Sequence, residues 1–284
     1  MKVLVFGRTG QVARALIDAA PGHGCTIEAL NREAADLSDP QACAAAIAAT
    51  DAQAVINAAA WTGVDAAEDH EAEAHVINAE APGAMARACA QANLPFVHLS
   101  TDYVFDGSPG AAWAPDAPTG PLSAYGRTKL AGERAVMDGD AKAVVLRTAW
   151  VFDGRGKNFV TTMLRLSETR DTLTVVGDQV GGPTPAAAIA DACLQLVEQL
   201  RSGAPGGLYH FSGAPDVSWA DFARAIFEEA GADVTVTDIT TADYPTPARR
   251  PANSALDCTS LRETYGIARP DWRLALKDII GEIV

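Results

Sequence analysis

A tyrosine and a lysine four residues apart are the clearest candidates for chemistry in this chain. Tyr125 and Lys129 occur in the segment YGRTK, and residues at i and i+4 share one face of a helix. A cation beside a phenol favours the phenolate, so we expect Lys129 to lower the pKa of Tyr125. A tyrosine of that kind can pass a proton to or from a substrate oxygen. Taken alone, the two residues are better explained as a surface tyrosine and lysine that happen to lie four positions apart.

Three further segments place small or polar residues directly after short apolar runs. Thr101 and Asp102 follow the apolar run at 96–100. Asn57 opens the segment NAAA after the run at 54–56, and GRTGQVA follows the run at 3–6 near the start of the chain. Within GRTGQVA, Gly7 and Gly10 allow a tight turn and a close approach to a pyrophosphate at a helix N-terminus. The spacing is GxxGxxA, so an ordinary turn between a strand and a helix remains the alternative.

Predicted strands and helices alternate in the first half of the chain, and this alternation would bring these residues together at one edge of a sheet. The predicted strands are 3–6, 26–30, 54–60, 96–100 and 143–148, and the predicted helices are 12–20, 40–49, 71–92 and 123–137. This alternation indicates an α/β fold, a Rossmann-type doubly wound parallel sheet with helices on both faces. Ligands of such sheets bind beyond the carboxyl ends of the strands.

The alternation weakens after residue 152. Predicted helices are 159–167, 186–200 and 219–230, a strand is 208–211, a turn is 181–185, and irregular loops are 107–121, 153–158 and 241–253. We therefore expect a dinucleotide-binding domain at 1–152. Residues 153–284 are expected to form mainly a smaller C-terminal substrate-binding lobe, with some segments returning to the sheet.

Composition excludes several classes of protein. The 284 residues are 48% hydrophobic and 20% charged, as in ordinary globular proteins, and the net charge is −14. That charge repels nucleic acid and anionic membranes, so we expect neither as a partner. The five cysteines are odd in number and contain no CxxC, which favours reduced thiols in the cytoplasm. The five histidines have no metal-ligand spacing, and the chain has no apolar stretch of about 18 residues.

The combined pattern resembles the extended short-chain dehydrogenase/reductase superfamily, and within it the dTDP-4-dehydrorhamnose reductase family. The segments that carry the resemblance are TGQVA, NAAAWTGVDAAE, STDYVFDG, YGRTKLAGE, RTAWVF, DQVGGPT, GLYHFSG and YPTPARRP, which span nearly the whole chain. The resemblance implies reduction of the 4-keto group of dTDP-4-dehydro-β-L-rhamnose to dTDP-β-L-rhamnose, the last step of dTDP-rhamnose biosynthesis. The partner would be a small nucleotide-sugar substrate.

The resemblance also implies site residues. Thr101, Tyr125 and Lys129 match the catalytic set: Tyr125 would protonate the C4 oxygen, Thr101 would hold that oxygen, and Lys129 would grip the nicotinamide ribose. Asp102 matches a position beside the substrate, and Trp150 matches a tryptophan against the sugar, although packing in the core is an alternative for its ring. The expected cofactor contacts are Gly7, Thr9, Gly10, Gln11, Val12, Arg32, Asp36, Leu37, Ala58, Ala59, Ala60, Thr62, Tyr125 and Lys129.

Weaker signals come from charged residues. Arg249 and Arg250 are suited to a substrate diphosphate, or else form a solvated pair. Asp65 follows the third strand and is expected to face the substrate. Arg8 and Arg32 near the adenosine ribose favour NADPH, while Glu33 and the family's tolerance leave NADH as an alternative.

We expect no metal. Some family members are described with a metal held by acidic residues at a dimer interface, but residues 13–15 and 186–188 contain no carboxylate. Glu282 is the nearest acidic candidate, and Mg²⁺ therefore has no clear site. The same observation leaves a monomer and a homodimer both open.

Two other functions remain as alternatives. One is a nucleotide-sugar 4-ketoreductase of different stereochemistry. The other is a non-catalytic subunit of the type that regulates methionine adenosyltransferase, which the presence of Thr101, Tyr125 and Lys129 disfavours.

Overall fold

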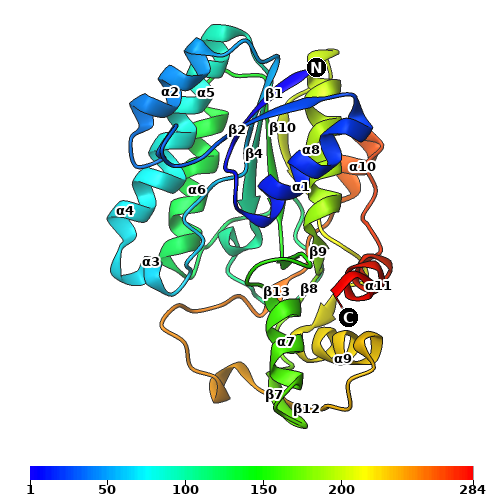
Figure 1. Cartoon of the computed structure of the whole chain (residues 1–284). Coiled ribbons are helices and arrows are strands. Elements are labelled where there is room, and N and C mark those ends of the chain that lie inside the picture. The colour runs from blue at the N-terminus through cyan, green and yellow to red at the C-terminus, as the bar shows by residue number, and fades with distance from the viewer. Residues whose placement is uncertain (284) are drawn as a thin grey trace.

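A six-stranded sheet forms the centre of the larger part of the molecule in the computed structural model, which describes residues 1–283. The strands are, in spatial order, β10 (Gly207–His210), β5 (Ala143–Thr148), β4 (Phe96–Thr101), β3 (Ala54–Asn57), β1 (Lys2–Phe6) and β2 (Thr26–Leu30). All neighbours are parallel. The order reverses between β1 and β3, which is where a doubly wound sheet binds its ligand. The predicted fold class is confirmed (Figure 1).

Alternation along the strands divides the core into two layers. In β1, Val3 and Val5 face one layer, while Leu4 and Phe6 face the other, and all four are at most 1% exposed. Successive side chains of a strand point to opposite faces, so a continuous apolar run fits a sheet that is covered on both sides.

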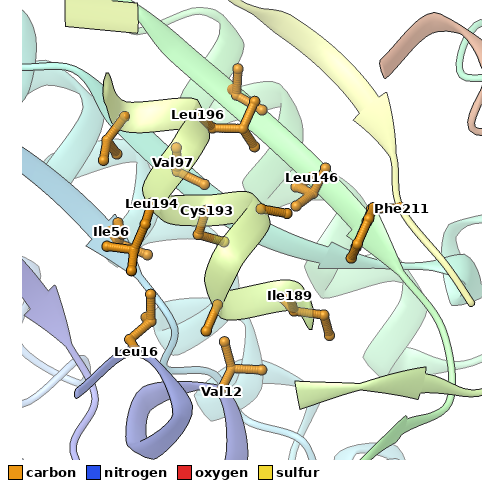
Figure 2. Packing of buried hydrophobic residues seen from close by; sticks show 14 of the residues in the cluster. Val12, Leu16, Ile56, Val97, Leu146, Ile189, Cys193, Leu194, Leu196 and Phe211 are labelled. Carbon is orange, nitrogen blue, oxygen red and sulfur yellow. The ribbon is translucent and has the colours of Figure 1, made fainter. Parts of the chain in front are cut away.

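Helices cover both faces of this sheet. α1 (Gln11–Ala19) and α8 (Ala186–Arg201) pack on one face, and α2 (Pro40–Ala49), α5 (Ala81–Ala92) and α6 (Ala124–Met137) pack on the other (Figure 1). Figure 2 shows the first layer, where side chains of α1 and α8 meet those of the central strands. Because α8 and β10 come from the second half of the chain, residues beyond 152 contribute to the larger part.

The helix predicted at 71–92 is interrupted. The chain forms α3 (Ala66–Asp69) and α4 (Glu71–His75), passes through a π-helical turn at Val76–Glu80, and continues as α5. Such turns insert one extra residue and often lie at functional sites. Here the turn brings the backbone of Asn78 against Gly132 of α6, where a side chain would collide. The predicted bounds of 71–92 are confirmed, and the π-helical turn within them is the feature that the sequence did not indicate.

A smaller lobe lies beyond one end of the sheet (Figure 1). Its strands β7 (Thr172–Val176) and β12 (Thr235–Ile239) are parallel neighbours. Its helices are α7 (Phe159–Ser167), α9 (Trp219–Ala230) and α11 (Trp272–Ile283). They share a core of buried aromatic and aliphatic residues, among them Phe152, Phe222 and Trp272. A further helix, α10 (Thr259–Tyr265), packs beside β10.

The remaining elements are short, and three predicted bounds are corrected. The short strands are β6 (Val151–Phe152), β8 (Val180–Gly181), β9 (Thr184–Pro185), β11 (Val217–Ser218) and β13 (Asn253–Ser254). The 3-10 turns are η1 (Ala20–His23), which joins α1 to β2, η3 (Asp102–Val104) and η4 (Thr241–Asp243). The turn expected at 181–185 is mostly β8 and β9, and the loop expected at 241–253 begins with η4 and ends in β13. Both depend on pairing with distant segments. The strand expected at 54–60 ends at Asn57, whose side chain accepts a hydrogen bond from the backbone of Ala59 and turns the chain.

Within residues 1–283, no helix combines the length and apolar composition needed to cross a bilayer.

Candidate active site

Tyr125 lies between two cavities of the protein. It is the second residue of α6, whose start is capped by the Ser123 hydroxyl accepting from the backbone N–H of Gly126 at 3.2 Å. On one side Tyr125 shares a small apolar cluster with Trp61, which lines the first cavity. On the other side its ring meets Tyr103 edge-on, with centroids 5.4 Å apart, and Tyr103 lines the second cavity.

Thr101 holds the end of β4 next to this tyrosine. Its hydroxyl accepts from the backbone N–H of Tyr103 at 3.2 Å and donates to Asp102 Oδ1 at 3.0 Å. The Thr101 hydroxyl favours the phenolate form of Tyr125 and so acts to lower the pKa of that tyrosine. The structure therefore brings together the hydroxyl and the phenol that were predicted to act on one substrate oxygen.

Lys129 is buried under the same site. Its side chain is one turn along α6 from Tyr125, is 2% exposed, and donates from Nζ to the backbone carbonyl of Leu99 at 2.7 Å. Burial lowers the pKa of Lys129 to about 8, against the opposing effect of the Glu133 carboxylate. The ammonium is thus fixed close to the carboxyl end of β4.

The expected lowering of the tyrosine pKa is wrong. The pKa of Tyr125 is raised to about 12, mainly by burial and to a smaller extent by the charge of Asp102, while the Thr101 hydroxyl has an opposing effect. Lys129 does not contribute to this shift, and its Nζ donates to the Leu99 carbonyl. The phenol is therefore held in its protonated form, as a proton donor requires.

The first cavity lies at the carboxyl ends of β1, β2 and β3 and has a volume of about 510 Å³. The predicted cofactor residues in its lining are Gly7, Thr9, Gly10, Arg32, Asp36, Leu37, Ala58, Ala59, Ala60 and Thr62. Gly7 has a φ of +110° and lies against the backbone of Ala58, where a side chain would be strained. Nothing lies within 4 Å of the position that a side chain at Gly10 would take, and no side chain caps α1.

These features fit a dinucleotide. The open surface at Gly10 and the uncapped N–H groups of α1 suit a pyrophosphate. Arg8 and Arg32 are exposed at the rim of the cavity, where a 2′-phosphate would be matched by charge. Two predicted contacts at the start of α1 do not line this cavity. Gln11 is the first residue of α1. The Val12 side chain packs into the core, so only the backbone of Val12 is available to a ligand at the turn.

The second cavity, of about 560 Å³, opens between the two parts of the molecule. It is lined by residues of α7, β7 and β12 together with Tyr103, Gln179, Trp219 and Arg250. Tyr103 and Trp219 were not singled out from the sequence, and the only signal for Tyr103 was its place directly after Asp102.

Arg250 and Asp65 form an ion pair at this cavity. The guanidinium donates to both Asp65 oxygens, at 3.1 and 2.9 Å, and to Thr246 and the Ala248 carbonyl. This pair lowers the pKa of the Asp65 carboxyl. Arg249 instead has an exposed side chain. The two adjacent arginines therefore occupy different environments.

Trp150 is positioned by an unusual backbone. Its φ is +49°, a conformation that is strained for a bulky residue. Its ring stacks on Trp219 with centroids 3.5 Å apart and packs against Gly181, where any side chain would collide. The strained backbone and the glycine both serve to place this ring between the sheet and the lobe.

A buried ion pair supports the floor of the site. Arg147 of β5 donates to Glu133 of α6 through Nε at 2.8 Å and Nη2 at 2.7 Å, and the side chains are 3% and 2% exposed. Ser100 donates to the same carboxylate, and Arg147 also donates to the carbonyl of Pro115. The pair joins α6, two strands and the loop at 107–121.

The side chains that could bind a metal ion lie apart from one another in the described residues. In the part of the chain that the structure describes, no three His, Cys, Asp or Glu side chains form a group that could hold a metal ion. All five cysteines are free and buried.

Comparison with known proteins gives one consistent result. A family model described as the RmlD substrate binding domain matches residues 1–284. A dTDP-4-dehydrorhamnose reductase from Sinorhizobium fredii is 40% identical, over 100% of this chain and 98% of that protein.

Two solved structures agree with this result. The crystal structure of a dTDP-4-dehydrorhamnose reductase from Clostridium acetobutylicum has a TM-score of 0.94 and 36% identity. That of a dTDP-4-dehydrorhamnose reductase from Bacillus anthracis in complex with NADP has a TM-score of 0.92 and 30% identity. Each match covers 100% of this chain and 99% of the other.

Proposed function

This chain belongs to the RmlD family of dTDP-4-dehydrorhamnose reductases, and from that premise we propose how it acts. It is an oxidoreductase that uses NADPH to reduce the 4-keto group of dTDP-4-dehydro-β-L-rhamnose, forming dTDP-β-L-rhamnose. The observation that carries the proposal is the position of Tyr125, which packs on the same apolar cluster as Trp61 of the first cavity and meets the ring of Tyr103 of the second.

The first cavity is the site that we assign to the cofactor. Gly7 and Gly10 admit the pyrophosphate to the start of α1, and Arg8 and Arg32 bind the 2′-phosphate. When it is bound, NADPH supplies the hydride to C4 of the sugar. Lys129, fixed by the Leu99 carbonyl, holds the ribose next to the nicotinamide.

Tyr125 supplies the proton. Its phenol is protonated across the physiological pH range, because burial raises its pKa to about 12. As C4 is reduced, the C4 oxygen becomes more basic and takes the proton of Tyr125. Thr101 hydrogen-bonds the same oxygen and stabilises the charge that develops on it.

The second cavity receives the nucleotide part of the substrate. Arg250 lies at its edge with its guanidinium fixed by Asp65, so it can meet a diphosphate without reordering. Arg249 adds charge from the exposed side of the loop. We assign the sugar to the space beside Asp102 and the Trp150 ring, where the ring would offer an apolar wall to the methyl group of the sugar.

We propose two domains for the chain and a cytoplasmic location for the protein. Residues 1–152 form the cofactor domain and residues 153–284 contribute mainly the substrate lobe, while α8 and β10 return to the sheet; Val284 lies outside the described residues. Free, buried cysteines fit a reducing compartment, so we place the enzyme in the cytoplasm. It acts as a monomer or a homodimer, and needs no nucleic acid or membrane.

The direct test is product identification. The protein is incubated with NADPH and freshly made dTDP-4-dehydro-β-L-rhamnose, loss of NADPH absorbance is followed, and the product is identified by NMR. We expect dTDP-β-L-rhamnose. A product with the opposite C4 configuration would indicate another nucleotide-sugar 4-ketoreductase, and no turnover would indicate a non-catalytic protein.

The Tyr125→Phe variant tests the role of the phenol. It keeps the aromatic ring and removes the proton, and general acid catalysis contributes about 10²–10⁴-fold. We expect kcat to fall by that factor while the Kd for NADPH, measured by fluorescence titration, stays within about twofold. Wild-type turnover by this variant would disprove the role of Tyr125.

A further inference from the structure

An arginine of α1 connects the glycine turn of the first cavity to the loop at 153–158. Arg14 donates from Nη1 to the backbone carbonyl of Thr9 at 2.6 Å and from Nη2 to the backbone carbonyl of Arg155 at 3.2 Å. Its Nη2 also lies 3.5 Å from Oδ2 of Asp153. One guanidinium thus contacts two segments that are far apart in the sequence.

The contact with Thr9 sets the direction of the next amide. The peptide bond between Thr9 and Gly10 is trans, and in a trans peptide the C=O and the following N–H point in opposite directions. The Gly10 N–H therefore points away from the guanidinium that holds the Thr9 carbonyl. Thr9 and Gly10 line the first cavity, whereas Arg14 does not. Arg14 can therefore fix this amide without touching a ligand of the cavity.

The loop at 153–158 is shaped around the same guanidinium. Gly156 has a φ of +74°, and a side chain there would lie 3.2 Å from Arg14 Nη2. Asp153 accepts a backbone hydrogen bond through Oδ1, while its Oδ2 is buried and, within the described residues, has no hydrogen-bond partner. The cations near Oδ2 are Arg14 at 3.5 Å and Arg155 at 3.6 Å. The side chains of Arg14 and Asp153 are only 28% and 16% exposed, so the loop encloses the pair.

This loop also begins α7 of the smaller lobe. Asn158 donates from Nδ2 to the carbonyl of Asp153 at 2.7 Å, and it caps α7 by accepting from the backbone N–H of Thr161 at 3.2 Å. α7 in turn lines the second cavity through Phe159 and Met163. The guanidinium is therefore held by a segment that is fixed to the substrate side of the molecule.

We propose that Arg14 is a positioning residue for the cofactor, which directs the Gly10 amide to the pyrophosphate and is kept in place by Asp153. This role rests on the proposed function, which places the pyrophosphate at the start of α1. An arginine suits the task because its planar fork donates to two carbonyls at fixed angles, which a lysine ammonium does not reproduce. The contacts of Arg14 are with the turn and the loop, so it acts on cofactor binding and not on proton transfer.

Equilibrium binding of two nucleotides tests this role. NADP⁺ contains the pyrophosphate, whereas 2′-AMP contains the adenosine and the 2′-phosphate without it. For Arg14→Met we expect the Kd for NADP⁺, measured by titration calorimetry, to rise about 10-fold, because the Gly10 amide loses its fixed direction. The Kd for 2′-AMP should stay within about twofold. A general loss of positive charge or of folded structure would weaken both nucleotides.

The variant Asp153→Asn tests the support from the loop. It keeps the shape of the side chain and removes the charge that faces Arg14, so we expect the Kd for NADP⁺ to rise about threefold. Because Asp153 acts through Arg14, the double variant should bind NADP⁺ as weakly as Arg14→Met alone. Asp18→Asn is the matched control and should leave this Kd unchanged, since it removes the same charge from an exposed ion pair between α1 and Arg155 of the same loop.

Steady-state kinetics separate positioning from chemistry. Arg14→Met should raise the KM for NADPH about 10-fold and leave kcat at saturating NADPH within about twofold, since a contact to the pyrophosphate is equal in the ground state and the transition state. Arg14→Lys keeps the charge and should still raise the KM for NADPH several-fold, because it lacks the planar fork.

Three results would overturn the inference. The first is an equal loss of NADP⁺ and 2′-AMP affinity in Arg14→Met, the second is additive effects of Arg14→Met and Asp153→Asn, and the third is an Asp18→Asn variant that matches Asp153→Asn. A wild-type protein that binds neither nucleotide would refute the cofactor assignment and this role together. If NADP⁺ binding follows the expected pattern but no sugar nucleotide is reduced, the role of Arg14 stands and the proposed reaction fails separately.

Discussion

Replacement of Glu133 by glutamine should destabilise the protein far more than its conservative chemistry suggests. Glu133 accepts two hydrogen bonds from Arg147 and one from Ser100, and the charged pair is 2–3% exposed. Glutamine keeps the shape of the side chain but removes its charge. The Arg147 guanidinium then remains buried with no counter-charge, because its other partners are the carbonyl of Pro115 and the ring of His210.

The expected magnitude follows from this burial. Removing one partner of a buried ion pair costs about 3–5 kcal/mol. For a chain of this length each kcal/mol lowers the melting temperature by about 2–4 °C, so we expect Tm to fall by roughly 6–20 °C. The loss should appear as a lower urea midpoint with an unchanged m-value, since the folded state keeps its surface.

The chain contains a matched control on the same helix. Arg127 of α6 and Glu71 of α4 form an ion pair with the same two-pronged geometry, at 2.8 and 2.7 Å, but both side chains are 45% exposed. Solvent-exposed pairs contribute about 0–1 kcal/mol, so Glu71→Gln should lower Tm by at most about 4 °C.

Urea and thermal unfolding of the two variants, followed by circular dichroism at pH 7.5, would decide the question. Equal losses in the two variants would refute the argument, because the two pairs share the same two-pronged geometry and differ in how deeply they are buried. A double variant, Glu133→Gln with Arg147→Met, should recover part of the loss, since it removes the uncompensated charge.

Three other outcomes are expected. Arg32→Ala should weaken NADPH binding about 10–100-fold and leave NADH nearly unchanged, since a charge-assisted bond to phosphate contributes roughly 1.5–3 kcal/mol; equal effects on both Kd values would show that Arg32 does not contact the 2′-phosphate. Lys129→Met should abolish turnover yet raise the free energy of unfolding at pH 7 by about 1–3 kcal/mol, because folding lowers the pKa of Lys129 from 10.5 to about 8 and a charge must be buried below pH 8. In the wild type this cost is relieved as the pH rises from about 8 to 10.5, so the advantage of the variant in urea unfolding should shrink over that window. Exhaustive EDTA treatment should leave kcat unchanged, since residues 13–15 and 186–188 have no carboxylate to hold Mg²⁺; activity lost with chelator and restored by Mg²⁺ would contradict this.

The main sheet and its cofactor edge were predictable from local patterns. Runs such as VLVF at the start and AVVL near residue 145 are buried on both faces, and β1, β4 and β5 lie within a residue of their predicted limits. The glycine turn at Gly7 and Gly10 was recognisable because a strand precedes it and a helix follows it. Periodicity and turn chemistry are local properties, so a single sequence carries them.

The smaller lobe was less predictable. β7 and β12 lie about sixty residues apart in the chain and pair with each other at the edge of the lobe, and their half-exposed alternation of polar and apolar residues resembles that of loops. The short strands β8, β9 and β13 contain two residues each. Pairing between distant segments defines such elements, and no local pattern reports it.

What the sequence determined by itself is the alternation of strands and helices, the turn for a pyrophosphate, and the presence of Thr101, Tyr125 and Lys129 in the right order. Only the tertiary structure decided their ionisation. The Lys129 charge does not lower the pKa of Tyr125, and desolvation, together with the charge of Asp102, raises it. It also decided which distant groups meet, because Ser254 reaches Asp102 across 152 positions of the chain. Burial and long-range contact depend on how the whole chain is packed, so they arise only when the two parts of the molecule come together.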